Sequence, residues 1–114
     1  MSCLFNSLSY FINDKSSTDI RNIICDYLES NHKIIEGMDT SSILKMENNN
    51  YIPHMRKTST WGGGIEIQSA CNIWEFKIIV HNIRDKNGKK IEFLPLDGNF
   101  NKIIEITWNG GHYE

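Results

Sequence analysis

The side chains that could form a nucleophile and its base lie at opposite ends of this chain. Cys3 is close to the amino terminus and His112 is close to the carboxyl terminus. A cysteine attacks as its thiolate, and a helix amino terminus or a neighbouring imidazole makes the thiolate easier to form. Cys3 opens an apolar helical pattern, whereas His112 follows a strand pattern and a Gly-Gly turn. Cys3 is therefore the candidate nucleophile and His112 its candidate base.

A third group is needed to orient the histidine ring. Glu114 lies two residues after His112 and is the candidate for this role, and Asn109 is the alternative if the turn folds back. The other two cysteines have a different context. Cys25 lies beside an apolar helical stripe and Cys71 follows Ala70, so we interpret both as buried packing residues.

The remaining patterns argue against metal, nucleotide and nucleic-acid sites. The sequence has no Cys-x-x-Cys pair and no two histidines at ligand spacing, so we expect no metal site. The run Trp61-Gly62-Gly63-Gly64 is not followed by Lys-Ser or Lys-Thr, which argues against a phosphate-binding loop. The net charge is -2 and the pI is near 6.1, with scattered basic residues. Nucleic acid is therefore not the expected partner.

Length and apolar runs indicate one domain away from the membrane. A chain of 114 residues suits one hydrophobic core, here residues 1–114. Its apolar runs are far shorter than the roughly 20 residues of a membrane span, and no signal-peptide pattern is present. Three widely spaced cysteines then fit reduced thiols. We expect a monomer in the cytoplasm or nucleus.

The order of periodic segments predicts the fold class. Helical spacing predicts helices over 3–12, 17–29, 41–46, 51–56 and 64–73, the second of them capped by Ser17 or Thr18. Strand patterns cover 77–83, 91–96 and 102–108. Asn87-Gly88 predicts a hairpin turn between the first two strands, and Asp97-Gly98 predicts a second turn. Helices followed by hairpin-linked strands favour an α+β domain with a small, mostly antiparallel sheet.

Several motifs, in order along the chain, resemble those of the ovarian-tumour (OTU) family of cysteine proteases. A Cys-Leu-Phe triplet opens the first helix, and Trp-Gly-Gly precedes an acidic-aliphatic pair in a later helix. His-Tyr and an acidic residue follow the last strand. The matching segments are Ser2 to Ser9, Ile20-Arg21 with Tyr27 and Asn31, Tyr51 to Met55, Trp61 to Gly63 with Glu66-Ile67, Ile78 to Val80, and Trp108 to Glu114.

The resemblance implies a papain-like OTU domain that acts on ubiquitin. Cys3 would attack the carbonyl at the carboxyl-terminal glycine of ubiquitin or a related modifier. His112 would take the thiol proton, and Glu114 would orient the imidazole. The partners would be ubiquitin or ubiquitinated proteins, and no cofactor or metal would be needed. We expect Trp108 and Tyr113 to pack in the core, with the wall of the channel for the ubiquitin tail as the alternative for Trp108.

The segment before Cys3 departs from the family pattern. In OTU proteases the oxyanion donors come from the nucleophile's own amide and from a preceding loop built around Asp-Gly, whereas only Met1 and Ser2 precede Cys3. Losing one donor costs on the order of 10²–10³ in turnover. We therefore expect either a longer natural amino terminus or weak activity. Two alternatives follow: a catalytically weak or dead OTU-like module that binds ubiquitin, and a small structural or interaction domain that only imitates the motifs.

Overall fold

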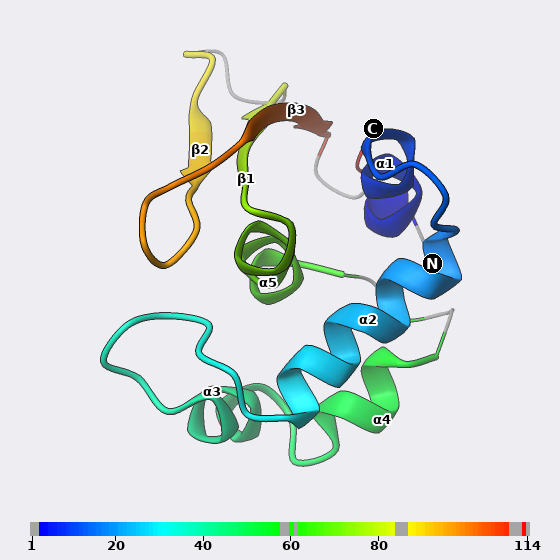
Figure 1. Ribbon diagram of the computed structural model, residues 1–114, viewed down its shortest axis with the longest axis vertical. Coiled ribbons are helices and arrows are strands. Elements are labelled where there is room, and N and C mark those ends of the chain that lie inside the picture. The colour runs from blue at the N-terminus through cyan, green and yellow to red at the C-terminus, as the bar shows by residue number, and fades with distance from the viewer. Residues whose placement is uncertain (1–2, 58–59, 61, 84–86, 110–112, 114) are drawn as a thin grey trace.

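The computed structural model describes residues 3–57, 60, 62–83, 87–109 and 113. A group of helices comes first in the chain and a group of strands follows it (Figure 1). This order confirms the α+β class. The helices are α1 (Cys3–Phe11), α2 (Ser17–Glu29), α3 (Thr40–Glu47), α4 (Tyr51–Met55) and α5 (Gly64–Trp74), and the strands are β1 (Phe76–Asn82), β2 (Lys90–Phe93) and β3 (Lys102–Trp108).

The sheet has the strand order β2-β1-β3 and is mixed rather than mostly antiparallel. β1 and β2 form the predicted antiparallel hairpin, from Ile78↔Phe93 to His81↔Lys90. β3 pairs with the other edge of β1 in a parallel arrangement over the whole length of both strands. The reason lies in the β2–β3 connection. The backbone N–H of Asn101 donates to the carbonyl oxygen of Glu75 over 2.8 Å, so β3 begins beside the start of β1.

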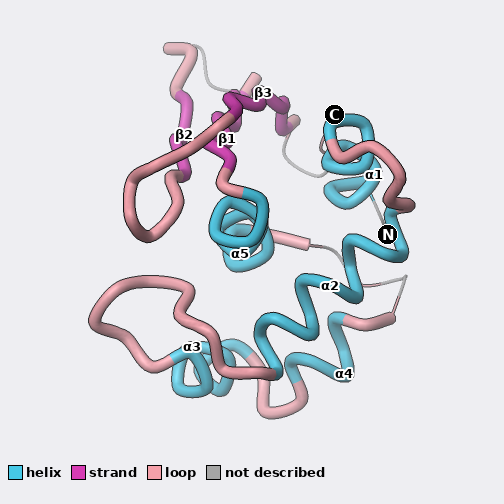
Figure 2. Tube along the Cα trace, in the orientation of Figure 1, coloured by secondary structure: helices cyan, strands magenta, loops and turns pink. Residues whose placement is uncertain are grey.

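The helices form layers on one side of the sheet. Figure 2 shows the strands together above α5, with α2, α3 and α4 beyond it. α5 contacts β1 and β2, while α2 contacts α1, α4 and α5. α1 lies beside β3 (Figure 1). No helix in the described ranges has the length and apolar character needed to cross a bilayer.

Local chemistry explains how the first two helices form. In α1 the apolar spacing buries Leu4, Phe5 and Leu8, so the remaining face looks outward. α2 begins with a reciprocal capping box between Ser16 and Asp19. The Ser16 hydroxyl accepts from the Asp19 N–H, and the Ser16 N–H donates to the Asp19 carboxylate, each over 3.1 Å. The prediction of a cap at Ser17 or Thr18 was wrong by one or two residues, since only Ser16 has an acid three positions later.

Gly62 lies where the α4–α5 connection meets α1. A Cβ at this position would lie 2.7 Å from Leu4 Cδ2 and 3.1 Å from two ring carbons of Phe5. Contacts this short require the neighbours to move. The glycine therefore lets the connection approach the two residues that follow Cys3.

We predict that Gly62→Ala destabilises the protein by about 1–3 kcal/mol, because the new methyl group overpacks the start of α1. Gly64→Ala is the matched control, since a Cβ there meets nothing within 4 Å and the position begins α5. Urea unfolding of both variants measures the difference. Equal stability of the two variants would contradict the close approach.

Candidate active site

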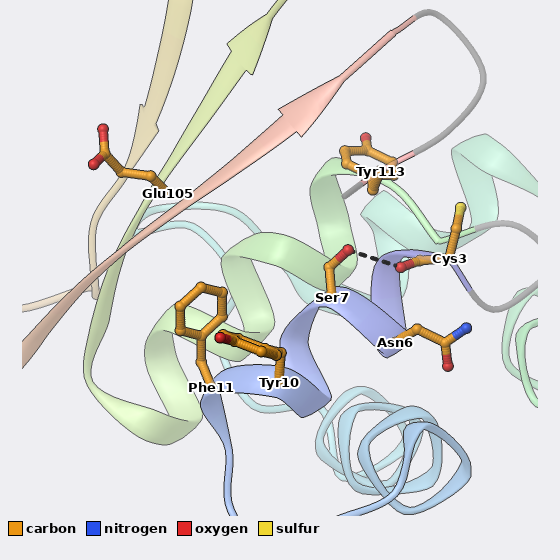
Figure 3. A pocket seen from close by; sticks show the side chains of 7 residues that line it. All are labelled: Cys3, Asn6, Ser7, Tyr10, Phe11, Glu105 and Tyr113. Carbon is orange, nitrogen blue, oxygen red and sulfur yellow. Dashed lines mark hydrogen bonds between the residues drawn. The ribbon is translucent and has the colours of Figure 1, made fainter.

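Cys3 is the first residue of α1 and carries a free, half-buried thiol. It lines an open depression of about 480 Å³ between α1, β3 and the carboxyl-terminal segment (Figure 3). The amino-terminal end of a helix favours negative charge, which suits a thiolate nucleophile. The Ser7 hydroxyl donates to the carbonyl oxygen of Cys3 over 3.0 Å and so holds the first turn together. The prediction that Cys3 lies in the first turn of a helix is confirmed.

Tyr113, near the carboxyl terminus, lies at this depression. Tyr113 forms an isolated antiparallel bridge with Trp108 at the end of β3, and its ring lies above Cys3 (Figure 3). His112 immediately precedes Tyr113 in the chain. His112 and Glu114 themselves lie outside the described residues. The structure thus brings the neighbour of the candidate base to the candidate nucleophile, and the roles of His112 and Glu114 stay predictions.

Trp108 and Tyr113 both pack against the core, as predicted. Tyr113 has a second role, since its half-buried ring also lines the depression. Burial raises the pKa of the Tyr113 phenol, and the nearby Cys3 and Glu66 add to the rise. The phenol therefore stays protonated at neutral pH. Asn109, the alternative orienting residue, is exposed just past β3.

Sequence reasoning missed most of the other residues that line the depression. Most of them lie three or four residues apart along α1, and Glu105 lines the depression from β3 (Figure 3). Helical spacing from Cys3 could have found them, because residues three and four apart share a face. The residues that line the depression are Cys3, Asn6, Ser7, Tyr10, Phe11, Glu105 and Tyr113. Glu105 also contacts His81 Nε2 across the sheet, at 2.8 Å.

A buried carboxylate links α4 to the start of α5. Glu66 is only 1% exposed. Its Oε1 accepts from the Gly63 N–H over 2.7 Å, and its Oε2 accepts from the Tyr51 hydroxyl over 2.5 Å. Burial raises the pKa of Glu66, and these hydrogen bonds and the charge of Arg21 oppose the rise. Glu66 thereby joins α4, the Gly63 turn and α5.

A buried guanidinium joins further segments. Arg21 of α2 is 1% exposed, and burial lowers its pKa from the usual value. Its Nη1 donates to the Met55 carbonyl over 2.7 Å, and its Nη2 donates to the Thr60 carbonyl over 2.9 Å. The Phe5 ring lies under the guanidinium, with its centroid 4.2 Å from Cζ. The sequence motif contained both Arg21 and Glu66, but no local signal indicated that they would be buried.

The other two cysteines differ from Cys3 in burial. Cys25 and Cys71 are both fully buried, which confirms the prediction that they pack in the core. Burial raises the pKa of Cys25 to about 11 and that of Cys71 to about 12. Both thiols are therefore protonated and inaccessible at neutral pH. Within the described ranges, no three His, Cys, Asp or Glu side chains gather as a metal site would require.

Comparison with known proteins identifies the family of this chain. The family model described as OTU-like cysteine protease matches residues 2–113. The chain belongs to the OTU-like cysteine protease family. Its curated relatives include the ubiquitin thioesterase OTU1 of Rattus norvegicus, at 26% identity over 99% of this chain, and that of Homo sapiens, at 25% identity over 99%. The chain spans about a third of the length of these relatives, 32% in both.

Solved OTU structures share the fold. An OTU domain in complex with ubiquitin is 30% identical and superposes with a TM-score of 0.76, covering 98% of this chain and 61% of that one. An OTU deubiquitinase of Wolbachia pipientis wMel bound to ubiquitin has a TM-score of 0.66 at 17% identity, covering 99% of this chain and 87% of that one. The second likeness concerns the fold alone. Both support the papain-like α+β architecture expected of an OTU domain.

We predict that iodoacetamide alkylates Cys3 in the folded protein and leaves Cys25 and Cys71 unmodified, because only the Cys3 thiol is partly exposed. Peptide mass spectrometry after a short exposure at neutral pH locates the label. Unfolding in urea is the control and makes all three thiols react. Labelling of Cys71 at the rate of Cys3 in the native protein would contradict this account.

A second prediction concerns the pH dependence of stability. The folded-state pKa of Glu66 lies above its ordinary value of 4.5, so the unfolded chain ionises first as pH rises. Stability from this group is fully present below the unfolded pKa and is lost as pH rises through the folded pKa. Glu66→Gln removes the titration and keeps an acceptor for Gly63. We therefore expect the stability of Glu66→Gln relative to the parent to rise with pH from the unfolded-state pKa up to the folded-state pKa and to level off above it.

Urea unfolding at several pH values measures this trend. Glu47→Gln is the control, because it makes the same change at an exposed carboxylate at the end of α3. A difference between Glu66→Gln and the parent that does not change with pH above 4.5 would contradict the raised pKa of Glu66.

Proposed function

We propose that this chain is a thiol-dependent deubiquitinase that hydrolyses the isopeptide bond between a lysine side chain and the carboxyl-terminal glycine of ubiquitin or a ubiquitin-like modifier. One observation carries the proposal: Cys3 and Tyr113, the neighbour of His112, line the same depression. Family membership, relatives named ubiquitin thioesterases and a related OTU domain in complex with ubiquitin support it.

The first step transfers the modifier to the enzyme. The imidazole of His112 takes the Cys3 proton, and the thiolate sulfur bonds to the glycine carbonyl carbon. As the tetrahedral intermediate collapses, the carbon–nitrogen isopeptide bond breaks. The lysine amine leaves with the proton that His112 held. A thioester between Cys3 and the modifier remains.

The second step regenerates the enzyme. His112 takes a proton from water, and the water oxygen bonds to the thioester carbon. The carbon–sulfur bond then breaks, and the sulfur of Cys3 recovers its proton from the imidazolium. Glu114, or Asn109 in its place, would hold the ring in the required tautomer. This chemistry needs no metal or cofactor.

Each tetrahedral intermediate carries an oxyanion, which needs N–H donors directed at it. The first N–H groups of an α-helix have no partner within the helix. Cys3 begins α1, so we assign its own backbone N–H as one donor. The start of a helix thus favours a thiolate and also supplies an N–H donor for the oxyanion.

Free thiols also bear on where the enzyme works. Cys3, Cys25 and Cys71 are all unpaired with one another, which suits a reducing compartment. We therefore propose the cytoplasm or nucleus as its location. We also propose that it acts as a monomer on ubiquitin or ubiquitinated proteins, without nucleic acid or membrane as a partner.

The test uses ubiquitin that carries a thiol-reactive group at its carboxyl terminus. Incubated with this probe, the parent should gain the mass of one ubiquitin, and Cys3→Ala should gain none. Cys25→Ala is the matched control, because it makes the same change at a buried thiol and should still react. Adduct formation by Cys3→Ala would assign the reactivity to another residue.

The same experiment separates the enzyme from a binding module. A folded parent that binds ubiquitin without forming an adduct would be a catalytically weak or dead OTU-like module. A folded parent that neither reacts nor binds would contradict recognition of ubiquitin altogether. Circular dichroism before mixing establishes that the parent and the variants are folded.

A further inference from the structure

Arg21 contacts three segments that are far apart in the sequence. Two of its nitrogens, Nη1 and Nη2, donate to the carbonyl oxygens of Met55, at the end of α4, and Thr60, in the α4–α5 connection. The face of its guanidinium lies on Phe5 in α1. One side chain of α2 therefore fixes the distance between α1 and the connection that leads to α5.

Stability alone is a poor explanation for a cation at this position. Moving a guanidinium out of water is costly, and burial accordingly lowers the pKa of Arg21. An apolar side chain of similar volume would avoid that cost, but the carbonyl oxygens of Met55 and Thr60 would lose their donors. Arginine also fixes the relative position of its partners. Its planar guanidinium directs several donors at fixed angles, and its face stacks on an aromatic ring.

The segments that Arg21 holds together lie next to Cys3, the candidate nucleophile. Phe5 is two residues after Cys3, in the same first turn of α1. Gly62, close to Thr60 in the chain, approaches Leu4 and Phe5 so tightly that a Cβ would overlap Leu4. The first turn of α1 is thus held between the Arg21 guanidinium and the Gly62 backbone.

We propose that Arg21 is a positioning residue for the reaction of Cys3. It acts through Phe5 and the α4–α5 connection, which together hold the first turn of α1 where the thiolate meets the modifier's carbonyl carbon. This role rests on the proposed function, because it concerns the transfer step at Cys3. A displacement of about 1 Å at the reacting atoms costs on the order of 10²-fold in rate.

The test compares Arg21→Lys with the parent in the reaction with the ubiquitin probe. Lysine keeps the charge but cannot reach two carbonyls and stack on Phe5 at once. We expect the maximal rate of adduct formation to fall about 10- to 100-fold, while the probe concentration for half-maximal rate changes little. Phe5→Leu keeps the core apolar and removes the ring under the guanidinium, and we expect a smaller loss in the same direction.

Two controls separate positioning from general stability. Arg56→Lys makes the same change at an arginine that pairs with Asp26 and Glu29 on the surface, and it should react like the parent. Ile34→Ala truncates a buried residue whose carbonyl oxygen accepts a hydrogen bond from Asn72 of α5. Measured well below its unfolding temperature, it should lose stability and keep its rate. If the maximal rate of adduct formation fell as much in Ile34→Ala as in Arg21→Lys, the positioning role of Arg21 would be overturned.

Amide hydrogen exchange gives a reading that does not depend on activity. In Arg21→Lys, exchange should accelerate in α1 more than in the carboxyl-terminal half of α5, because α1 loses its stacking partner. Uniform acceleration in all helices would overturn the positioning role even if the parent never reacted with the probe. Failure of the parent to react would instead overturn the proposed function, so the two failures are distinguishable.

Discussion

The need to satisfy one buried guanidinium shapes the part of the fold that carries the candidate site. A buried charge must find hydrogen-bond partners and an opposite charge nearby. Arg21 finds two carbonyls in and beyond α4 and the ring of Phe5 in α1, and the charge of Glu66 acts on it. Glu66 in turn is satisfied by Tyr51 and the Gly63 N–H. These contacts connect α1, α2, α4 and α5 around the α4–α5 connection, where Gly62 approaches Leu4 and Phe5, the two residues that follow Cys3.

Much of the fold could be predicted because its signals are local. Helical spacing in α1 and α2 and the β-branched run of β3 identified those elements within one or two residues. β2 was harder, since Lys90–Phe93 is short and exposed and its pattern extends into the following loop. The parallel pairing of β3 with β1 could not be predicted from the sequence. It depends on where the β2–β3 connection crosses the start of β1, as the hydrogen bond from Asn101 to Glu75 shows, and no local pattern encodes that path.

The features of the candidate site also differ in how far local sequence patterns predict them. The place of Cys3 at the start of a helix followed from apolar spacing, because the positions that enter the core leave Cys3 on the opposite side. The bridge between Tyr113 and Trp108 is a contact that no local pattern encodes, and it became visible only in the structure. Arg21 was harder still. A charged residue within an apolar helical pattern usually lies at its solvent edge, whereas here the partners that make burial tolerable come from distant segments.

We propose that Cys3 and His112 act as a pair. The most direct test is the rate of Cys3 alkylation by iodoacetamide as a function of pH, in the parent and in His112→Ala. If the imidazole takes the thiol proton, the parent should keep reacting at pH values at which the variant has already lost its reactivity, and its profile should show an additional step. Superimposable profiles for the two folded proteins would mean that His112 does not act on Cys3, and would contradict the account.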